Sequence, residues 1–138
     1  MRKKVILMLS LSLIVMVLGI RWAHLENLSK SSTVALDYLK DEGLFVLYNK
    51  GEYGPYYLTK SDINEKPYND FLLVQNQTPE FFIDKELHHK FFYVNNHPLS
   101  SLFGVGGVFV TVMMSGEEVI GAFSVKNGVT YSLSGKVE

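Results

Sequence analysis

Residues 108–133 read VFVTVMMSGEEVIGAFSVKNGVTYSL and predict three consecutive β-strands. Runs rich in valine, methionine and phenylalanine at 108–114 and 118–125 flank Ser115-Gly116-Glu117, a tight-turn composition. Asn127-Gly128 is a hairpin signal that joins the second run to residues 129–133. Apolar side chains occupy both odd and even positions of the first run, so we expect a central strand with both faces at least partly covered. The chain therefore predicts an antiparallel meander near its C-terminal end.

Upstream of the meander, several apolar runs predict further strands of the sheet. These predicted strands are residues 44–48, 56–59, 71–75 and 90–94, with a turn at 50–55 between the first two. Residues 61–67 form a polar connection with room for one helical turn. Thr78-Pro79 is a helix-start signal, but the Phe81-Phe82-Ile83 that follows forms helix poorly, so the structure of this segment stays open.

One amphipathic helix is predicted before the strands, at residues 34–42. Ser32 or Thr33 can accept a hydrogen bond from its first free amides. Ala35, Tyr38 and Leu39 recur at helical spacing, and Gly43 supplies the left-handed stop. A helix of this kind lies across a sheet, so the fold class that we expect is α+β.

The N-terminal segment is apolar enough to enter a membrane. Residues 5–20 are sixteen uncharged, mostly apolar positions between Arg2-Lys3-Lys4 and Arg21-Trp22. A helix of that length covers about 24 Å, and Trp22 can extend it toward the roughly 30 Å of a hydrocarbon core. Three cations before the run, against Arg21 after it, place the N-terminus in the cytoplasm.

The best-placed cleavage pattern, Val17-Leu18-Gly19, leads into Ile20-Arg21-Trp22, an awkward mature N-terminus. We therefore expect a retained signal-anchor in a single-pass protein of the cell membrane, and secretion after cleavage is the alternative. The predicted organisation is an anchor at 1–23, a tether at 24–32 and an extracytoplasmic α+β domain at 33–138. Ser10, Ser12 and Gly19 are small, but they form no G-x-x-x-G pair with which the span would bind another helix.

Charge and cysteine content exclude several classes of protein. Four of the 13 basic residues belong to the anchor region, which leaves nine against 14 acidic residues and a net charge of −5 for the rest. The basic patch that nucleic-acid binding needs is therefore missing. The chain has no cysteine, which excludes disulfides and lipid modification of the lipoprotein type. The stability of the exported domain must come from its apolar core.

Histidines of the middle region are the candidate metal ligands. His88, His89 and His97 lie near Asp84 and Glu86 in the sequence, a set that can supply zinc ligands. Adjacent histidines on a strand point to opposite faces, however, and no ligand motif with metal spacing is present. We predict no metal site and no cofactor.

Catalytic motifs are also missing from the sequence. Asp62, Glu65 and Asp70 could serve a cell-envelope hydrolase, but they lie in a polar loop that needs such residues for solubility. The glycine-rich stretch 103–108 precedes a strand and lacks the lysine of a phosphate loop, so it predicts a turned entry to that strand. No serine lies in a nucleophile-elbow context. A hydrolase using these carboxylates or the histidines is thus the alternative to a noncatalytic protein.

Aromatic residues crowd the middle third of the chain, and several form adjacent pairs. Neighbours on a strand face opposite sides, so one ring of each pair is expected in the core. Outward rings that cluster would make a binding surface for a protein, peptide or glycan of the envelope. The rings that form this possible partner surface are Tyr53, Tyr56, Tyr57, Phe81, Phe82, Phe91, Phe92 and Tyr93.

A resemblance adds to this interpretation. Tyr38–Gly43, Asn95–Leu99, Val119–Ser124 and Tyr131–Lys136, behind a short basic and apolar leader, resemble small uncharacterised membrane-anchored proteins of Gram-positive bacteria. The order of helix then meander is similar to cystatin-like and PepSY-like modules outside bacterial membranes. The resemblance implies a module that binds or inhibits a partner, and it assigns no site residue. We expect a membrane-anchored extracytoplasmic binding or regulatory module without catalytic activity.

Overall fold

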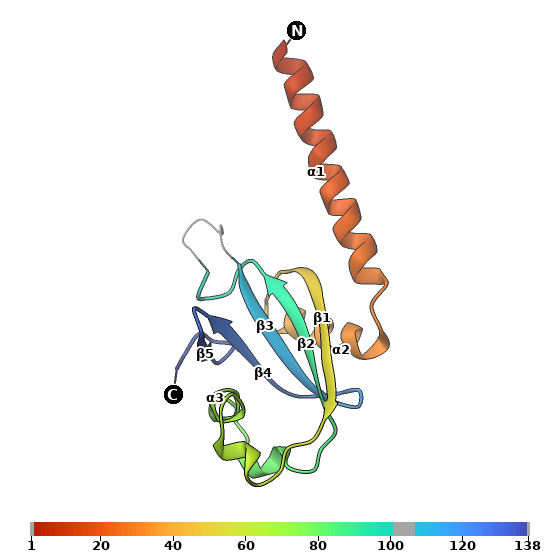
Figure 1. Cartoon of the computed structure of the whole chain (residues 1–138). Helices are drawn as coiled ribbons and strands as arrows, with labels where there is room; N and C mark the ends of the chain where they lie inside the picture. Colours follow the sequence, from red (N-terminus) through yellow and green to blue (C-terminus); the bar gives the residue numbers. More distant parts are fainter. Residues whose placement is uncertain (1, 101–106, 138) are drawn as a thin grey trace.

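The computed structural model describes residues 2–100 and 107–137, so most of the glycine-rich stretch lies outside the described residues (Figure 1). The chain forms an α+β fold, as predicted. The helices are α1 (Arg2–Glu26), α2 (Lys30–Asp41) and α3 (Tyr68–Leu73), with 3₁₀-helices η1 (Asp62–Asn64) and η2 (Pro79–Phe82). The strands are β1 (Val46–Tyr56), β2 (Leu87–Val94), β3 (Val108–Ser115), β4 (Glu118–Lys126) and β5 (Val129–Tyr131).

All five strands form one antiparallel sheet in the order β1-β2-β3-β4-β5. The predicted meander is confirmed as β3, β4 and β5. Asn127 and Gly128 both have positive φ, 53° and 76°, which is the backbone that an Asn-Gly hairpin turn requires. β3 lies at the centre of the sheet, and six of its eight residues are buried, so both of its faces are at least partly covered, as expected.

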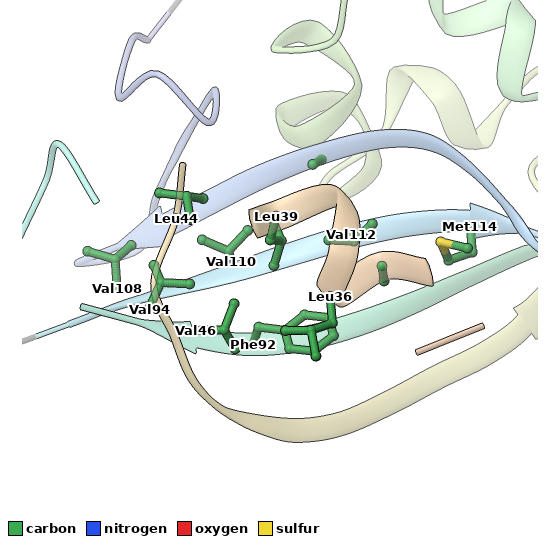
Figure 2. Close-up of a cluster of buried hydrophobic side chains, with 12 residues drawn as sticks. Leu36, Leu39, Leu44, Val46, Phe92, Val94, Val108, Val110, Val112 and Met114 are labelled. Atoms are coloured by element: carbon green, nitrogen blue, oxygen red, sulfur yellow. The ribbon is translucent and has the colours of Figure 1, made fainter. Parts of the chain in front are cut away.

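Helix α2 covers one face of the sheet and makes the first core cluster (Figure 2). Leu36 and Leu39 of α2 pack against Phe92 of β2 and Val110 and Val112 of β3. The start of this helix differs from the prediction, because Ser29 and not Ser32 or Thr33 is the N-cap and accepts from the Ser32 amide at 3.2 Å. Four more residues at the N-terminal side, 30–33, become helical as a result.

The opposite face is covered at one end by α3, η1 and η2, which form the second core cluster. The strand predicted at 71–75 is wrong, because Phe71 and Leu72 belong to α3. A helical turn buries both of these neighbouring side chains, whereas a strand would send one of them away from the core. The turn expected within 61–67 is η1, and Thr78-Pro79 begins the short helix η2.

Strand β1 is continuous where a turn was predicted. Residues 50–55 do not reverse the chain, and of the returning strand predicted at 56–59 only Tyr56 belongs to β1. Gly51 and Gly54 adopt φ of 132° and 123° beside irregularities in the β1–β2 register. The glycines therefore allow bulges in an edge strand, and β2 is the partner of its whole length. The strand predicted at 90–94 lies within β2.

The end of α1 contacts the edge of β1. The Arg21 guanidinium donates from Nε to the Val46 carbonyl at 3.0 Å and lies over the Phe45 ring. The Asn49 amide donates to Nε2 of His24 at 3.2 Å. The segment predicted as a tether, 24–32, is mostly helical, and only Asn27–Ser29 separates the two helices. Figure 1 shows α1 leaving the domain at the end of the sheet where β1 and β3 begin.

A buried cation lies on the α2 face of the sheet. Lys90 is 3% exposed and pairs with Glu52, its neighbour across the β1–β2 ladder. This lysine lowers the pKa of the Glu52 carboxyl through a hydrogen bond and its charge. A buried ammonium without its carboxylate would cost more than the pair itself contributes, because the charge stays desolvated.

Replacing the carboxylate should therefore destabilise the protein. We expect Glu52→Gln to lower the free energy of unfolding by about 2 kcal/mol, the scale of a hydrogen bond to a charged group. The double variant Glu52→Gln/Lys90→Met should recover most of that loss, because it removes the buried charge as well. Urea denaturation followed by circular dichroism measures both values. A double variant no more stable than Glu52→Gln would contradict this account.

Candidate partner-binding site

The outer side of β4 is only half covered by the last strand. Among the described strands, β5 alone lies on this side, and it pairs only with Ser124, Val125 and Lys126. A cleft of about 420 Å³ runs beside the preceding residues of β4. Its walls come from the end of α2, the loop after α3 and the C-terminal segment. Its polar and backbone lining includes Tyr38, Glu42, Gln75, Asn76, Gln77, Gly121, Ala122, Ser132 and Ser134.

We name residues 118–123 and this cleft the β4 open edge. The amide of Ala122 shows which way the free backbone groups of this edge point. It is directed away from β3 and donates to Oε1 of Gln75 at 3.0 Å. The Gln75 side chain is held by a second hydrogen bond, from Nε2 to the Phe71 carbonyl at 2.7 Å. Gln75 thus supplies the carbonyl that a neighbouring strand would otherwise offer to Ala122.

Gly121 makes this arrangement possible. A Cβ at this position would lie 2.6 Å from Oε1 of Gln75, so any larger residue would push the glutamine off the strand. The site is not visible in the sequence, because the apolar residues 71–74 favour a strand that would include Gln75 and hide its role. The one available signal was Gly121 itself, a glycine inside a strand, which marks close approach by another group.

The eight aromatic residues predicted as a possible partner surface do not form one surface. Phe82 and Phe92 are fully buried, and they lie in different core clusters. Phe91 is more exposed than Phe92, as strand alternation predicts, and Phe81 is more exposed than Phe82 although that pair lies in η2. Tyr53, Tyr57 and Phe81 are the exposed members, and Tyr56, Phe91 and Tyr93 are half-buried. Phe82 and Phe92 therefore do not belong to a partner surface, because buried rings cannot contact a partner in the folded protein.

Several of these rings instead surround a buried histidine. His89 lies with its ring centroid 5.3 Å from those of Tyr56 and Phe71 and 5.8 Å from that of Phe123. The Tyr56 hydroxyl lies 2.5 Å from Nε2 of His89, and the neutral imidazole accepts a hydrogen bond from this hydroxyl. Burial among the rings lowers the pKa of His89 to about 4, and it raises the pKa of Tyr56. The histidine is therefore a neutral member of the core at pH 7.

This histidine should make the fold sensitive to acid. Because its pKa is near 6.5 when unfolded and about 4 when folded, the unfolded state takes up the proton first as the pH falls. Stability is full above pH 6.5 and is lost toward pH 4, by about 1.4 kcal/mol per pH unit. His89→Gln should flatten that slope by about one proton, measured by urea denaturation across this range. Burial lowers the pKa of His97 too, so a residual slope is expected, and an unchanged slope would refute the assignment.

The other candidate metal ligands lie apart. His88 and Tyr57 both bond the Glu86 carboxylate at 3.0 Å, and these hydrogen bonds lower the pKa of Glu86. His97 bonds Ser124 instead. Among residues 2–100 and 107–137, no group of three or more histidine or carboxylate side chains is placed to hold a metal ion. Asp84 has a positive φ of 60° in the connection before β2.

The carboxylates suggested for a hydrolase have local roles. Asp62 accepts from the Thr59 amide at 2.7 Å and from its hydroxyl at 2.6 Å, which stabilises the start of η1 and lowers the pKa of Asp62. Asp70 pairs with Lys66 one helical turn away at 3.4 Å. Glu65 is exposed and accepts from the Asn69 amide through its backbone carbonyl. These contacts give Asp62 and Glu65 structural roles in the polar connection and Asp70 a role in α3.

Within residues 2–100 and 107–137, Ser124 and His97 are the one serine–histidine pair with the spacing of a nucleophile and its base, Oγ to Nε2 being 2.6 Å. The Leu99 amide donates to Nδ1 of His97, so the ring proton lies on Nε2 and points at the serine oxygen. His97 in this tautomer cannot take the proton of Ser124. Both residues are buried, so the pair joins the loop after β2 to β4 and meets no substrate.

Comparisons give no relative from which a site could be transferred. No family model, no curated protein and no solved structure matches the chain. The β4 open edge is therefore assigned from its own geometry alone.

Proposed function

We propose that this protein is a membrane-anchored extracytoplasmic module that binds an extended segment of a partner protein at the β4 open edge. The observation that carries the proposal is that β5 covers only half of β4. The uncovered half borders a cleft, and its Ala122 amide bonds the Gln75 side chain instead of a neighbouring strand. An extended peptide that adds to such an edge gains main-chain hydrogen bonds, and pockets for alternate side chains provide specificity. The sequence resemblance to small membrane-anchored bacterial proteins favours the same class.

The shape of the cleft favours a single peptide over a second sheet. Pairing between two whole sheets needs a flat, exposed edge. Here the strand lies between the end of α2, the 74–77 loop and the 132–134 segment, which leave room for one chain. Glu42 is the charged residue of the lining, and the amides of Gln75, Asn76 and Gln77 add donors and acceptors. A polar or basic extended segment suits these walls.

Helix α1 supports the membrane part of the proposal. Among the described residues it is the one helix long and apolar enough to cross a membrane, with a mean hydropathy of 2.3 and none of its apolar window buried. A signal sequence has the same character. Arg21 and His24 contact β1 directly after the span, so a retained helix would join the domain to the membrane without a flexible linker.

Retention of the helix can be measured directly. We expect the protein to stay in the membrane fraction after carbonate extraction, and intact mass spectrometry should give the full 15.6 kDa chain. A protease added outside the cell should digest the domain and leave residues near the N-terminus protected. A product in the medium that is shorter by the apolar leader would refute the anchor and leave the peptide site to be tested separately.

Strand addition has its own signature, which peptides can reveal. Short linear peptides selected from a random displayed library on the full chain in nanodiscs are the probes. Backbone N-methylation at alternate peptide positions should weaken binding at least about tenfold, while methylation at the positions between them changes it less than about threefold. Gln75→Ala should strengthen binding, because the amide of Ala122 becomes free for the peptide.

A matched pair of positions locates the peptide. A photo-crosslinking residue at Asn76, which lines the cleft, should capture the selected peptide, whereas the same residue at Asn64, an exposed position in η1, should not. Uniform effects of methylation at all positions, or equal capture at both sites, would reject strand addition at β4.

A further inference from the structure

A row of apolar side chains crosses the sheet on the face that α3 covers only at its far end. Tyr48 pairs with Tyr93, Tyr93 with Phe109, and Phe109 with Val125, so the four residues form one line across β1 to β4. Tyr48 and Tyr93 stack at 5.3 Å, and the Tyr93 and Phe109 rings lie 4.9 Å apart. We name these four residues the aromatic row. Phe109 is 37% exposed and Val125 38% exposed, although both belong to central strands.

A groove of about 460 Å³ borders the aromatic row. Gly51 occupies the neighbouring position on β1, opposite Phe91, and its missing side chain opens this groove. The ammonium of Lys50 lies 4.5 Å above the Phe109 ring at its rim. Among the described residues no carboxylate forms an ion pair with Lys50. The groove thus combines an apolar floor with the positive charge of Lys50, and the carboxylate of its lining, Glu52, is paired with Lys90.

The contacts of α1 place this surface next to the membrane. Arg21 follows the apolar run directly and bonds Val46, the first residue of β1. The aromatic row is two residues farther along β1, which is about 7 Å. The headgroup layer of a bilayer is also several ångströms thick, and tyrosine is enriched there. The row therefore lies within reach of the headgroups of the bilayer that α1 enters.

Charge on this part of the sheet agrees with an anionic surface. The strand segments at this end, 46–50, 91–94, 108–111 and 124–126, contain Lys50 and Lys126 and no carboxylate, and Glu52, which follows on β1 and lines the groove, is paired with Lys90. The domain as a whole is acidic, so its negative charge lies on other parts of the chain. A soluble peptide has equal access to every exposed part of the sheet, whereas the anchor keeps this end of the sheet beside the lipid headgroups.

We propose that the aromatic row and Lys50 form a lipid-contact surface that takes the headgroup of an anionic phospholipid. This inference rests on the proposed membrane anchoring by α1 and is independent of peptide binding at β4. The lysine meets the phosphate, and the row inserts its rings among the headgroups. The domain would then have one fixed orientation on the bilayer, with the β4 open edge away from the lipid.

Fluorescence quenching by headgroup spin-labelled lipid tests the surface in the full chain. The protein has no native cysteine, so Val125→Cys accepts a single fluorophore beside the row. Phe81→Cys is the matched distal position, because Phe81 is 39% exposed and has Lys85 at 4.5 Å, like Phe109 and Lys50. In nanodiscs of phosphatidylcholine and phosphatidylglycerol we expect quenching at position 125 and little at position 81. The single tryptophan, Trp22, reports on the anchor in the same sample.

Charge variants test the headgroup assignment. In the labelled Val125→Cys chain, Lys50→Gln should raise the phosphatidylglycerol content needed for half-maximal quenching about fivefold. Lys85→Gln should leave it unchanged. Thermal unfolding of each variant verifies that the fold is intact.

The outcomes separate the two proposals. Absence of Trp22 quenching would refute the anchor, and with it this inference. Quenching of Trp22 with equal signals at positions 125 and 81 would overturn the lipid-contact surface alone. Equal quenching in pure phosphatidylcholine, unaffected by Lys50→Gln, would overturn the assignment to an anionic headgroup. Loss of the position-125 signal on adding a selected β4 peptide would show that peptide and lipid compete for this face, which also contradicts the proposal.

Discussion

Burial of β3 on both faces is the constraint on which the rest of this structure depends. Val110 and Val112 face α2, and Met113 on the opposite face reaches the cluster made with α3 and the 3₁₀-helices. A central strand of this kind needs a helix on one side and a second layer on the other, because neither row of side chains can be left in water. The chain lacks cysteine, so these two clusters and the sheet itself provide its stability.

The C-terminal meander and α2 could be predicted because their signals are local. An Asn-Gly turn, a Gly43 stop and a helical spacing of apolar residues each involve neighbours in the sequence. The errors arose where long-range contacts decide. Gly51 and Gly54 indicate a turn in the sequence, but β2 pairs along all of β1 and keeps the strand continuous. Phe71-Leu72 indicates a strand, but both side chains are buried in the second core cluster, which requires a helical turn. The aromatic row depends on strand register, and the contact of Gln75 with Ala122 joins residues 47 positions apart, so neither is visible in local sequence patterns.

The two edges of the sheet are treated differently. On β1, side chains of α1 meet the outward backbone groups of Val46 and Asn49, and bulges interrupt the strand farther along. On β4, one glutamine side chain occupies one amide of a longer open stretch. Unpaired edges invite unwanted association unless they are blocked. The contrast concentrates any strand pairing on β4, where the cleft walls restrict which chains can approach.

Covering of β1 by α1 has a consequence during biosynthesis. A ribosome delivers the N-terminal residues first, so Arg21 and His24 exist before β1 is made and β1 exists before β2. The groups that cover β1 are therefore present when this strand emerges, whereas its partner strand β2 starts about thirty residues after β1 ends. Arg21 and His24 thereby shield nascent β1 from pairing with other incomplete chains. The side of the sheet that is synthesised last stays open to a partner strand.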